Sequence, residues 1–112
     1  MRFLCLAYGA DDDWLALAQS ERAALLAQDD VLRRRGDLVA AVGGAVTVTA
    51  WDGAPTTTDG SYARTEIPLA GFGVIEAENL EQAVSLVADT PCARAKGYVE
   101  LRPIHDDTGS PP

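Results

Sequence analysis

The sequence predicts an α+β fold of the ferredoxin-like type, a split β-α-β arrangement in which two helices cover one face of an antiparallel sheet. Three observations support this prediction. The chain has 112 residues, the length of one domain. Its apolar residues recur with strand or helix spacing in the order β-α-β-hairpin-β-α-β, a split β-α-β unit with an inserted β-hairpin. Each predicted helix has one apolar stripe, so a single helix layer buries both stripes.

The first part of the chain is predicted to form a central strand and a long helix. Residues 2–8 are almost all apolar, as in a strand buried on both faces. Carboxylates at 11–13 suit the positively polarised start of a helix. A helix over 20–35 follows, with Ser20 as its N-cap and Gly36 just beyond its end. Its apolar positions Leu17, Ala24, Leu25, Val31 and Leu32 show seven-residue spacing, and Glu21, Arg22, Asp29, Arg33 and Arg34 are assigned to the outer face.

The middle of the chain is predicted to contain a short strand, a hairpin and a long loop. The short strand covers 38–42. Residues 46–51 alternate apolar with β-branched polar side chains, and the Asp-Gly pair at 52–53 is a strong hairpin signal, so that 55–58 returns as the second strand. The loop over 59–69 is long for a compact domain, and this length favours a functional role.

The next strand and helix are predicted at residues 70–77 and from Asn79 onward. Gly71 and Gly73 fall on one face of the strand and leave room for a helix, a partner or a ligand to approach closely. Asn79, with a glutamine three residues later, has the pattern of a capping box that starts a helix. Pro91 is predicted to end this helix.

A final strand at 98–102 completes a domain over residues 1–104, and residues 105–112 are predicted to be a polar C-terminal tail. The helix layer leaves the second face of the sheet without cover. Residues assigned to that face are Cys5, Ala7, Phe72, Val74, Val99 and Leu101. An open apolar face is unusual on a monomer, so we expect a homodimer packed sheet to sheet. Trp14 and Trp51 are interpreted as packing or dimer contacts rather than as the roof of a pocket.

Composition and charge exclude several classes of protein. Asp and Glu outnumber Lys and Arg by 17 to 9, which gives a net charge of −8 and disfavours nucleic acid and anionic membranes as partners. No apolar run approaches the ~20 residues of a membrane span, and the N-terminus lacks a secretory signal, so a cytoplasmic location is expected. Cys5 and Cys92 form neither a metal motif nor a disulfide framework and are interpreted as reduced thiols. No metal or cofactor is expected.

Several short segments between residues 2 and 104 carry a family likeness. They are Tyr8-Gly9, Ser20-Glu21-Arg22, Thr58-Asp59-Gly60-Ser61-Tyr62, Gly71-Phe72-Gly73-Val74-Ile75, Leu80-Glu81-Gln82-Ala83 and Val99-Glu100-Leu101-Arg102-Pro103-Ile104. Together they resemble the YCII-related family, in particular its DGPF branch. The Asp-Gly-Pro-Phe motif of that branch stands here as residues 59–62, with two of its four positions changed. The Lys-Glu pair that often follows the motif is Thr65-Glu66, which keeps only the acid.

This resemblance implies a ferredoxin-like α+β fold assembled as a dimer through its sheets, a dimeric α/β barrel. Relatives in the wider family carry a His–Asp pair proposed as an active site, and lyase-type chemistry is assigned to some of them. The DGPF branch is frequently encoded beside sigma factors. The one histidine of this chain is His105, and the first-helix region where the family histidine would fall has Ser20, Glu21 and Arg22 instead. A histidine-based acid–base mechanism is therefore not expected.

Asp59 is the first candidate for a functional residue. A carboxylate serves as a general base when burial raises its pKa, and as an anionic anchor when it is hydrogen-bonded. The alternative is a simple turn, since Asp-Gly is a common turn pair. Tyr8, at the end of a central strand, either donates a hydrogen bond into a cleft or keeps its hydroxyl in water. Ser61 and Tyr62 share the loop with Asp59 and are assigned to the same cleft.

Further charged residues have two interpretations each. Arg64 and Glu66 lie two residues apart in the same loop, and they either pair with each other or hold an anionic ligand. Arg102 either binds an acidic ligand or pairs with an acid such as Glu100. His105 is not expected to be a metal ligand or acid–base group, because a histidine in a polar tail lacks an orienting partner.

Three functions follow from these residues. The first is binding of a small organic molecule in a cleft between sheet and helices, lined by Tyr8, Asp59, Ser61 and Tyr62, in an accessory or regulatory role. The second is a cofactor-free lyase or isomerase with Asp59 as the base and Tyr8 as the acid or oxyanion donor. The third is a protein-interaction module that contacts, for instance, a transcription factor.

Overall fold

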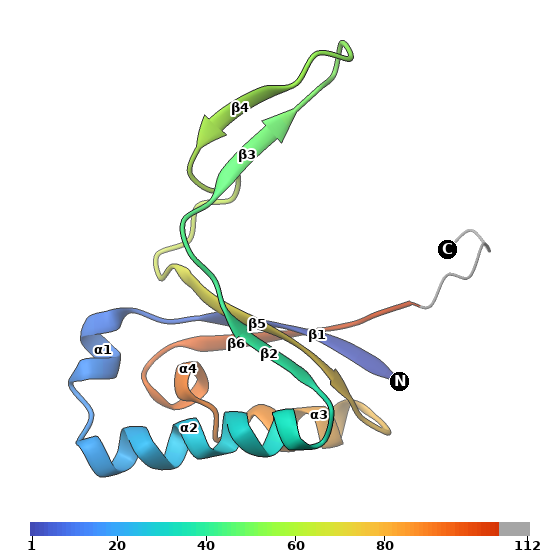
Figure 1. The fold of residues 1–112 in the computed structure, drawn as a ribbon. Coiled ribbons are helices and arrows are strands. Elements are labelled where there is room, and N and C mark those ends of the chain that lie inside the picture. Colours follow the sequence, from blue (N-terminus) through green and yellow to red (C-terminus); the bar gives the residue numbers. More distant parts are fainter. Residues whose placement is uncertain (106–112) are drawn as a thin grey trace.

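The structure, a computed structural model that describes residues 1–105, has a four-stranded antiparallel sheet, helices on one side of it, and a separate two-stranded hairpin (Figure 1). In chain order the elements are β1 (Arg2–Tyr8), α1 (Asp11–Leu15), α2 (Gln19–Arg34), β2 (Leu38–Ala41), β3 (Val46–Thr49), β4 (Thr56–Asp59), β5 (Leu69–Glu76), α3 (Leu80–Val87), α4 (Pro91–Arg94) and β6 (Tyr98–Pro103). The strand order β2-β5-β1-β6 is that of a split β-α-β unit. The predicted ferredoxin-like α+β class with an inserted hairpin is confirmed.

The hydrophobic core lies between the sheet and the helices. Strand β1 is central and pairs antiparallel with both β5 and β6, so that Cys5 stands opposite Gly73 on one side and Leu101 on the other. The buried residues that form the core are Phe3, Cys5, Ile75, Ala77, Ala83 and Val87. Because side chains alternate along a strand, the odd-numbered residues of β1 and β5 face the helices.

The other side of the sheet has no helix against it among the described residues (Figure 1). We call it the uncovered face. By register its apolar residues are Leu4, Leu6, Leu38, Ala40, Phe72 and Val74, all half-buried or exposed. The predictions for Phe72 and Val74 agree with this register. Cys5, Val99 and Leu101 were assigned here wrongly, because they belong to the core or pack against it. The error arises because β1 is apolar on both faces, so alternation alone does not say which face looks outward.

Ala7 was also assigned to the uncovered face, and this too is wrong. Its Cα stands opposite Gly71 on β5 and Val99 on β6, in the same alternation as Cys5, so it lies on the helix side of the sheet. There it lines a cavity beneath α2. The small side chain leaves space between sheet and helix that a larger residue would fill.

Local signals in the sequence mark the end of α2 and the start of α3 as predicted, whereas the predicted start of α2 and the predicted end of α3 are wrong. Gly36 has φ +98°, and the amides of Gly36 and Asp37 donate to the carbonyls of Arg33 and Leu32, a Schellman motif that ends α2 as predicted. The N-cap of α2 is Ala18, which has no capping side chain, so the prediction of Ser20 is wrong. These contacts position the end of α2 beside β2.

Helix α3 begins at the predicted capping box. The Asn79 side chain accepts a hydrogen bond from the Gln82 amide at 2.8 Å, and the Gln82 side chain accepts one from the Glu78 amide at 2.6 Å. Pro91 does not end this helix, because α3 stops at Val87 and Pro91 is the first residue of α4. A proline fits that position, since the first amides of a helix have no intrahelical partner.

Strands β3 and β4 form a hairpin apart from the main sheet, which we call the arm (residues 45–60). It rises from the side of the sheet opposite the helices (Figure 1). The pairing runs from Val46 opposite Asp59 to Thr49 opposite Thr56. The predicted hairpin is thus confirmed, with the first strand two residues shorter than expected and the second shifted by one residue. Six residues connect Thr49 to Thr56, and Gly53 takes φ +89° within this connection.

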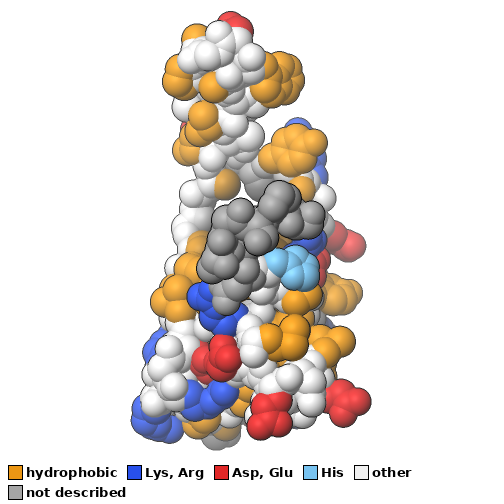
Figure 2. Space-filling model, turned by 90° about the vertical axis from the view of Figure 1, so that its right-hand side faces the viewer, with side chains coloured by type: hydrophobic (Ala, Val, Ile, Leu, Met, Phe, Trp, Pro, Cys, Tyr) orange, Lys and Arg blue, Asp and Glu red, His pale blue; other side chains and the backbone are white. Residues whose placement is uncertain are grey.

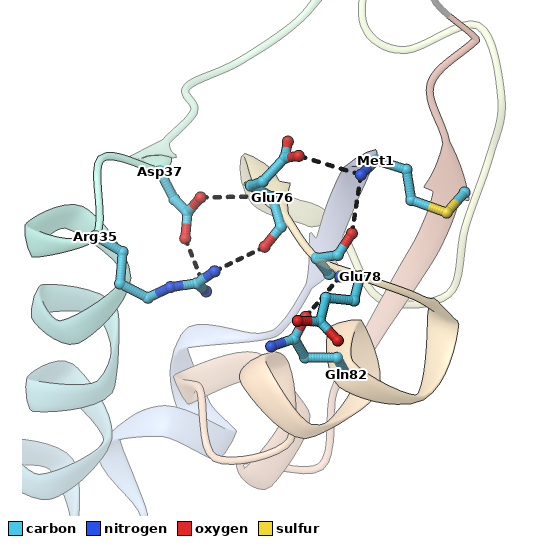
Figure 3. A network of polar contacts seen from close by, with 7 residues as sticks. Met1, Arg35, Asp37, Glu76, Glu78 and Gln82 are labelled. Carbon is cyan, nitrogen blue, oxygen red and sulfur yellow. Dashed lines mark hydrogen bonds and ion pairs between the residues drawn. The ribbon is translucent and has the colours of Figure 1, made fainter.

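A polar network joins the end of α2 to the sheet (Figure 3). The Arg35 guanidinium lies 3.1 Å from the Asp37 carboxylate and donates to the Glu76 carbonyl at 2.7 Å. Asp37 also accepts from the Glu76 amide at 2.9 Å, and its side chain is 5% exposed. The amino group of Met1 binds the Glu76 carboxylate at 3.1 Å. This network holds α2 in register over the sheet, where it forms the roof of the cavity described next.

Within residues 1–105, none of the helices has both the length and the apolar composition required to cross a bilayer. The tail predicted over residues 105–112 lies outside the described residues except for His105, which is exposed beyond the end of β6.

Candidate functional site

A cavity of about 380 Å³ lies between α2 and the helix side of the sheet. We call it the helix–sheet cavity. Its floor includes Ala7, Gly71 and Gly73 from the central strands. Its other walls come from α1, α2, α3, α4 and β2 and include Trp14, Leu26, Asp29, Leu32, Arg33, Val39, Val87, Pro91 and Cys92. Most of these side chains are apolar, as in a site for a small organic molecule.

The two glycines of β5 explain why this volume is open. Gly71 and Gly73 lie on the helix side and carry no side chain that would fill the space under α2. Strand β2 also approaches them closely, because a Cβ on Gly73 would lie 2.9 Å from the Leu38 carbonyl oxygen and one on Gly71 would lie 2.8 Å from that of Ala40. The sequence left open whether a helix, a partner or a ligand uses this space. In the structure the glycines serve a strand contact and line a cavity.

Two carboxylates line this cavity, the exposed Asp11 on α1 and Asp29. Asp29 is half-buried on α2, and burial raises its pKa above the ordinary value for an aspartate. Arg33, one turn further along the helix, opposes that increase, and Asp30 adds to it. Asp30 itself is exposed and pairs with Arg33 at 2.9 Å. A partly desolvated carboxyl group beside a guanidinium can accept a hydrogen bond from a ligand hydroxyl or exchange a proton with it.

From the sequence, Asp29 was assigned to the outer face of the helix, and this is wrong because Asp29 lines the helix–sheet cavity. A signal was available. Asp29 is four residues after Leu25 and three before Leu32, so it lies in the same stripe as the apolar residues that face the sheet. Leu32 is 2% exposed. A charged residue inside an apolar stripe is a candidate functional residue. Its position in the stripe, and not its charge alone, should decide which face of the helix it is assigned to.

Two thiols also line the cavity, and both are protonated at neutral pH. Burial raises the pKa of Cys5 to about 11, with a smaller contribution from Asp37. Burial and the charge of Asp29 raise the pKa of Cys92. Both cysteines are free in this structure. Because the thiolate is the reactive form, neither residue is an activated nucleophile here.

The residues predicted as the site are divided between the arm, the following loop and the main sheet. Asp59 is the last residue of β4 and is exposed. Gly60 follows it with φ +104°. Ser61, Tyr62 and Arg64 are exposed in the loop between β4 and β5, and Tyr62 is 90% exposed. None of these four site residues is among those that line the helix–sheet cavity.

Tyr8 and Glu66 are brought together in a second cavity of about 540 Å³ at the end of the sheet. Its other lining residues are Thr65, Ile67, Tyr98, Val99 and Glu100. Glu66 and Glu100 are exposed there, and Tyr98 is 67% exposed, so water competes for every polar contact. Asp59 is not among its lining residues. The helix–sheet cavity is the better candidate site, because its Asp29 carboxylate is partly desolvated.

Arg102, a further candidate residue, pairs with an acid in the structure. Arg102 donates to Glu100 at 2.7 Å, and this hydrogen bond and the charge of Glu100 raise the pKa of Arg102. Of the two interpretations given for Arg102, an acidic ligand or an ion pair, the structure shows the ion pair with Glu100. Over the described part of the chain, no group of three or more His, Cys, Asp or Glu side chains is placed to hold a metal ion.

Comparison with known proteins gives a family and a fold. A family model described as YCII-related domain matches residues 1–107. A solved structure of 5-chloro-2-hydroxyhydroquinone dehydrochlorinase (TftG) from Burkholderia phenoliruptrix AC1100, in complex with 2,5-dihydroxybenzoquinone, aligns with a TM-score of 0.50. It is 19% identical, and the alignment covers 94% of each chain. A comparison with curated proteins finds no match.

Proposed function

The chain belongs to the YCII-related family, and from this membership we propose that its helix–sheet cavity binds a small, mainly apolar organic molecule with a hydroxyl group. The observation that carries the proposal is Asp29, a partly desolvated carboxylate in an otherwise mostly apolar wall. A hydroxyl group that donates to this carboxylate compensates for its lost hydration, and a ring that fills the space contacts the surrounding leucine and valine side chains.

The size of the cavity and the fold relative favour a six-membered ring as the ligand. A volume of about 380 Å³ is at the lower end of the range for ligand pockets. TftG, which shares the fold at low identity, was solved with 2,5-dihydroxybenzoquinone, a hydroxylated ring. We therefore propose phenols and hydroxyquinones as the ligand class. We also propose that the protein has an accessory or regulatory role and belongs to the DGPF branch of the family.

Binding of phenol and of toluene, measured by isothermal titration calorimetry, tests this proposal. The two rings differ only in the group that would donate to Asp29, so phenol should bind and toluene should bind more weakly. D29N should weaken phenol binding by about tenfold, because a hydrogen bond to a charged group contributes about 1.5–3 kcal/mol. D30N changes the neighbouring, exposed aspartate by the same chemistry and should leave the affinity within about twofold. Equal binding of phenol to D29N and wild type would contradict the proposal.

A second candidate function is proton transfer to or from the bound ring. The raised pKa of Asp29 favours it, because a general base is most effective when its pKa lies closer to the working pH. TftG is named as a dehydrochlorinase, so the assay is chloride release from a chlorinated hydroxyhydroquinone. D29N should abolish this release while D30N retains it. Chloride release that is unchanged in D29N would exclude Asp29 as the base.

Acid–base chemistry by Asp59 and Tyr8 is a separate proposal for an enzyme. Tyr8 lines the second cavity together with Glu66, and Asp59 stands at the base of the arm. In this arrangement Y8F and D59N should each reduce turnover, whereas D29N should not. The pair of assays thus distinguishes the two candidate sites.

We also propose a homodimer that packs through the uncovered face. What supports it is the row of apolar side chains on that face, of which Leu38 is 50% exposed, and the absence of a covering helix within the described residues. Light scattering at micromolar concentration should give about twice the chain mass of 11.8 kDa. A mass of one chain at that concentration would contradict the proposal.

A further inference from the structure

Among the described residues, the arm carries the large hydrophobic side chain with the highest exposed fraction. Trp51 in its connecting loop is 95% exposed, and Val46 and Val48 on β3 are 59% and 60% exposed. Figure 2 shows hydrophobic side chains on the arm, above the body of the molecule. An exposed tryptophan and two exposed valines on one projecting element indicate a contact surface rather than a solvent-facing one.

The two faces of the arm differ in composition. Val46 and Val48 share one face with their pairing partners, Asp59 and Thr57. The other face consists of threonines only, at positions 47, 49, 56 and 58. Thr47 and Thr49 are half-buried, whereas the two valines are exposed. The hairpin therefore presents its apolar side to the surroundings, which is the reverse of what water alone would favour.

Within residues 1–105, the hydrogen bonds described for the arm run within the hairpin. The Thr47 hydroxyl donates to the Gly60 carbonyl, and the Gly60 amide donates to the Ala45 carbonyl. A two-stranded hairpin by itself is marginally stable in water. The chain has a radius of gyration of 16.1 Å, against about 13 Å for a compact chain of this length. A projecting hairpin of this kind holds its shape when another surface packs against it.

The charge of the arm limits the kinds of partner that it can bind. Its charged residues are Asp52 and Asp59, and it contains no lysine or arginine. A surface of this kind does not suit nucleic acid or an anionic membrane. It suits a mainly apolar surface, and the uncovered face of the same chain carries a row of apolar side chains over β2, β5 and β1. The charged residues Glu100 and Arg102, which share that face on β6, pair with each other. The arm and the uncovered face lie on the same side of the sheet, opposite the helices (Figure 1). A twofold axis over the uncovered face would direct each arm toward the body of the other copy.

We propose that the arm clasps a second copy of this chain, with Val46, Val48 and Trp51 buried against the partner. The inference rests on the proposed homodimer and adds to it. Each sheet face supplies one contact, and each arm supplies a second contact at a distance from the twofold axis. The arm thus explains an inserted hairpin that the body of the fold does not use for its own core.

Sedimentation equilibrium of two matched variants tests the arm. V46T/V48T/W51S alters the apolar side, and T49S/T58S alters the threonine side of the same hairpin. The first variant should raise the dimer dissociation constant by at least about tenfold, because burial of each large apolar side chain contributes about 1.5–3 kcal/mol. The second should stay within about threefold of wild type. L15S, which changes an exposed leucine on the helix side, should have no effect.

Fluorescence of Trp51 provides an independent test of the clasp, which still applies if the triple arm variant fails to fold. In W14F, Trp51 is the remaining tryptophan. Its emission should be blue-shifted in the dimer and should move to longer wavelength on dilution as the dimer dissociates. A wild-type chain that stays monomeric overturns both the homodimer and the clasp. A dimer whose dissociation constant is equal in all variants, or whose Trp51 emission stays that of a solvated tryptophan, overturns the clasp alone and leaves the arm to another kind of partner.

Discussion

The helix side of the sheet and the arm both carry β-branched and aromatic residues but differ in how these are buried. On the helix side, Phe3 and Ile75 are 2% and 1% exposed, and the arm carries a tryptophan that is 95% exposed. One region is stabilised by contacts within the chain, and the other presents its apolar side chains outward. The comparison places the buried core of this chain on the helix side, and the exposure of the arm is the reason that we propose an intermolecular contact for it.

Truncation of a core residue should produce the largest effect. F3A removes a side chain that is buried between sheet and helices, and it should cost about 3–5 kcal/mol of unfolding free energy. V48T on the arm should change the unfolding free energy of the monomer by less than about 0.5 kcal/mol. Urea denaturation at low protein concentration measures both. A loss from V48T as large as that from F3A would show that the arm belongs to the core of the monomer.

The polar network at the end of α2 should give the next largest effect. D37A removes a nearly buried carboxylate that binds Arg35 and the Glu76 amide, and it should cost about 2–3 kcal/mol. D30A removes the exposed partner of Arg33 on the same helix and should cost less than about 1 kcal/mol. The same denaturation assay compares them. Equal losses would mean that the network around Asp37 does not hold α2 to the sheet.

The raised pKa of Cys5 predicts that the protein loses stability at alkaline pH. The folded-state pKa of about 11 is above the 9.0 of an unperturbed thiol, so the unfolded state releases the thiol proton first as the pH rises. Between pH 9 and 11 the thiol should therefore reduce stability by about 1–2 kcal/mol, an effect absent below pH 9. C5A should lose less stability than wild type across this interval, although it is less stable at neutral pH. Parallel pH profiles of the two proteins would contradict this assignment.

Asp29 should give the smallest change in stability, and its sign is informative. Since burial raises its folded-state pKa, the charged form is disfavoured in the folded state, and stability falls as the pH rises through that pKa. D29N should therefore melt at a slightly higher temperature than wild type at pH 7, and this difference should shrink at acidic pH. D30N is the control. A lower melting temperature for D29N at pH 7 would show that the carboxylate stabilises the fold.

Some short-range signals predicted the fold correctly. The capping box at Asn79 and the glycine after α2 were confirmed, because each acts within one turn of the backbone. The N-cap predicted at Ser20 and the helix end predicted at Pro91 were wrong, although these are signals of the same range. The hairpin around Asp52 was predicted from its Asp-Gly pair, and its shorter first strand follows from the six-residue connection, whose conformation depends on more than that pair.

The site was harder to predict, because it depends on which face of each element meets another element. Asp29 was assigned to the outer face of α2 because it is charged, although it lies in the same apolar stripe as Leu32 and lines the cavity. Gly71 and Gly73 were identified as a place of close approach, but their neighbours α2 and α4 join them only in three dimensions. The role of Asp59 stays a prediction, because a motif in a loop does not by itself define what the loop faces.

The most direct test of the proposed binding site is a crystal structure of the protein soaked with a phenol or with 2,5-dihydroxybenzoquinone. The ring should lie in the helix–sheet cavity, above Gly71 and Gly73, with an oxygen within hydrogen-bond distance of the Asp29 carboxylate. A ring bound between Tyr8 and Glu66, with the helix–sheet cavity holding only water, would contradict the account.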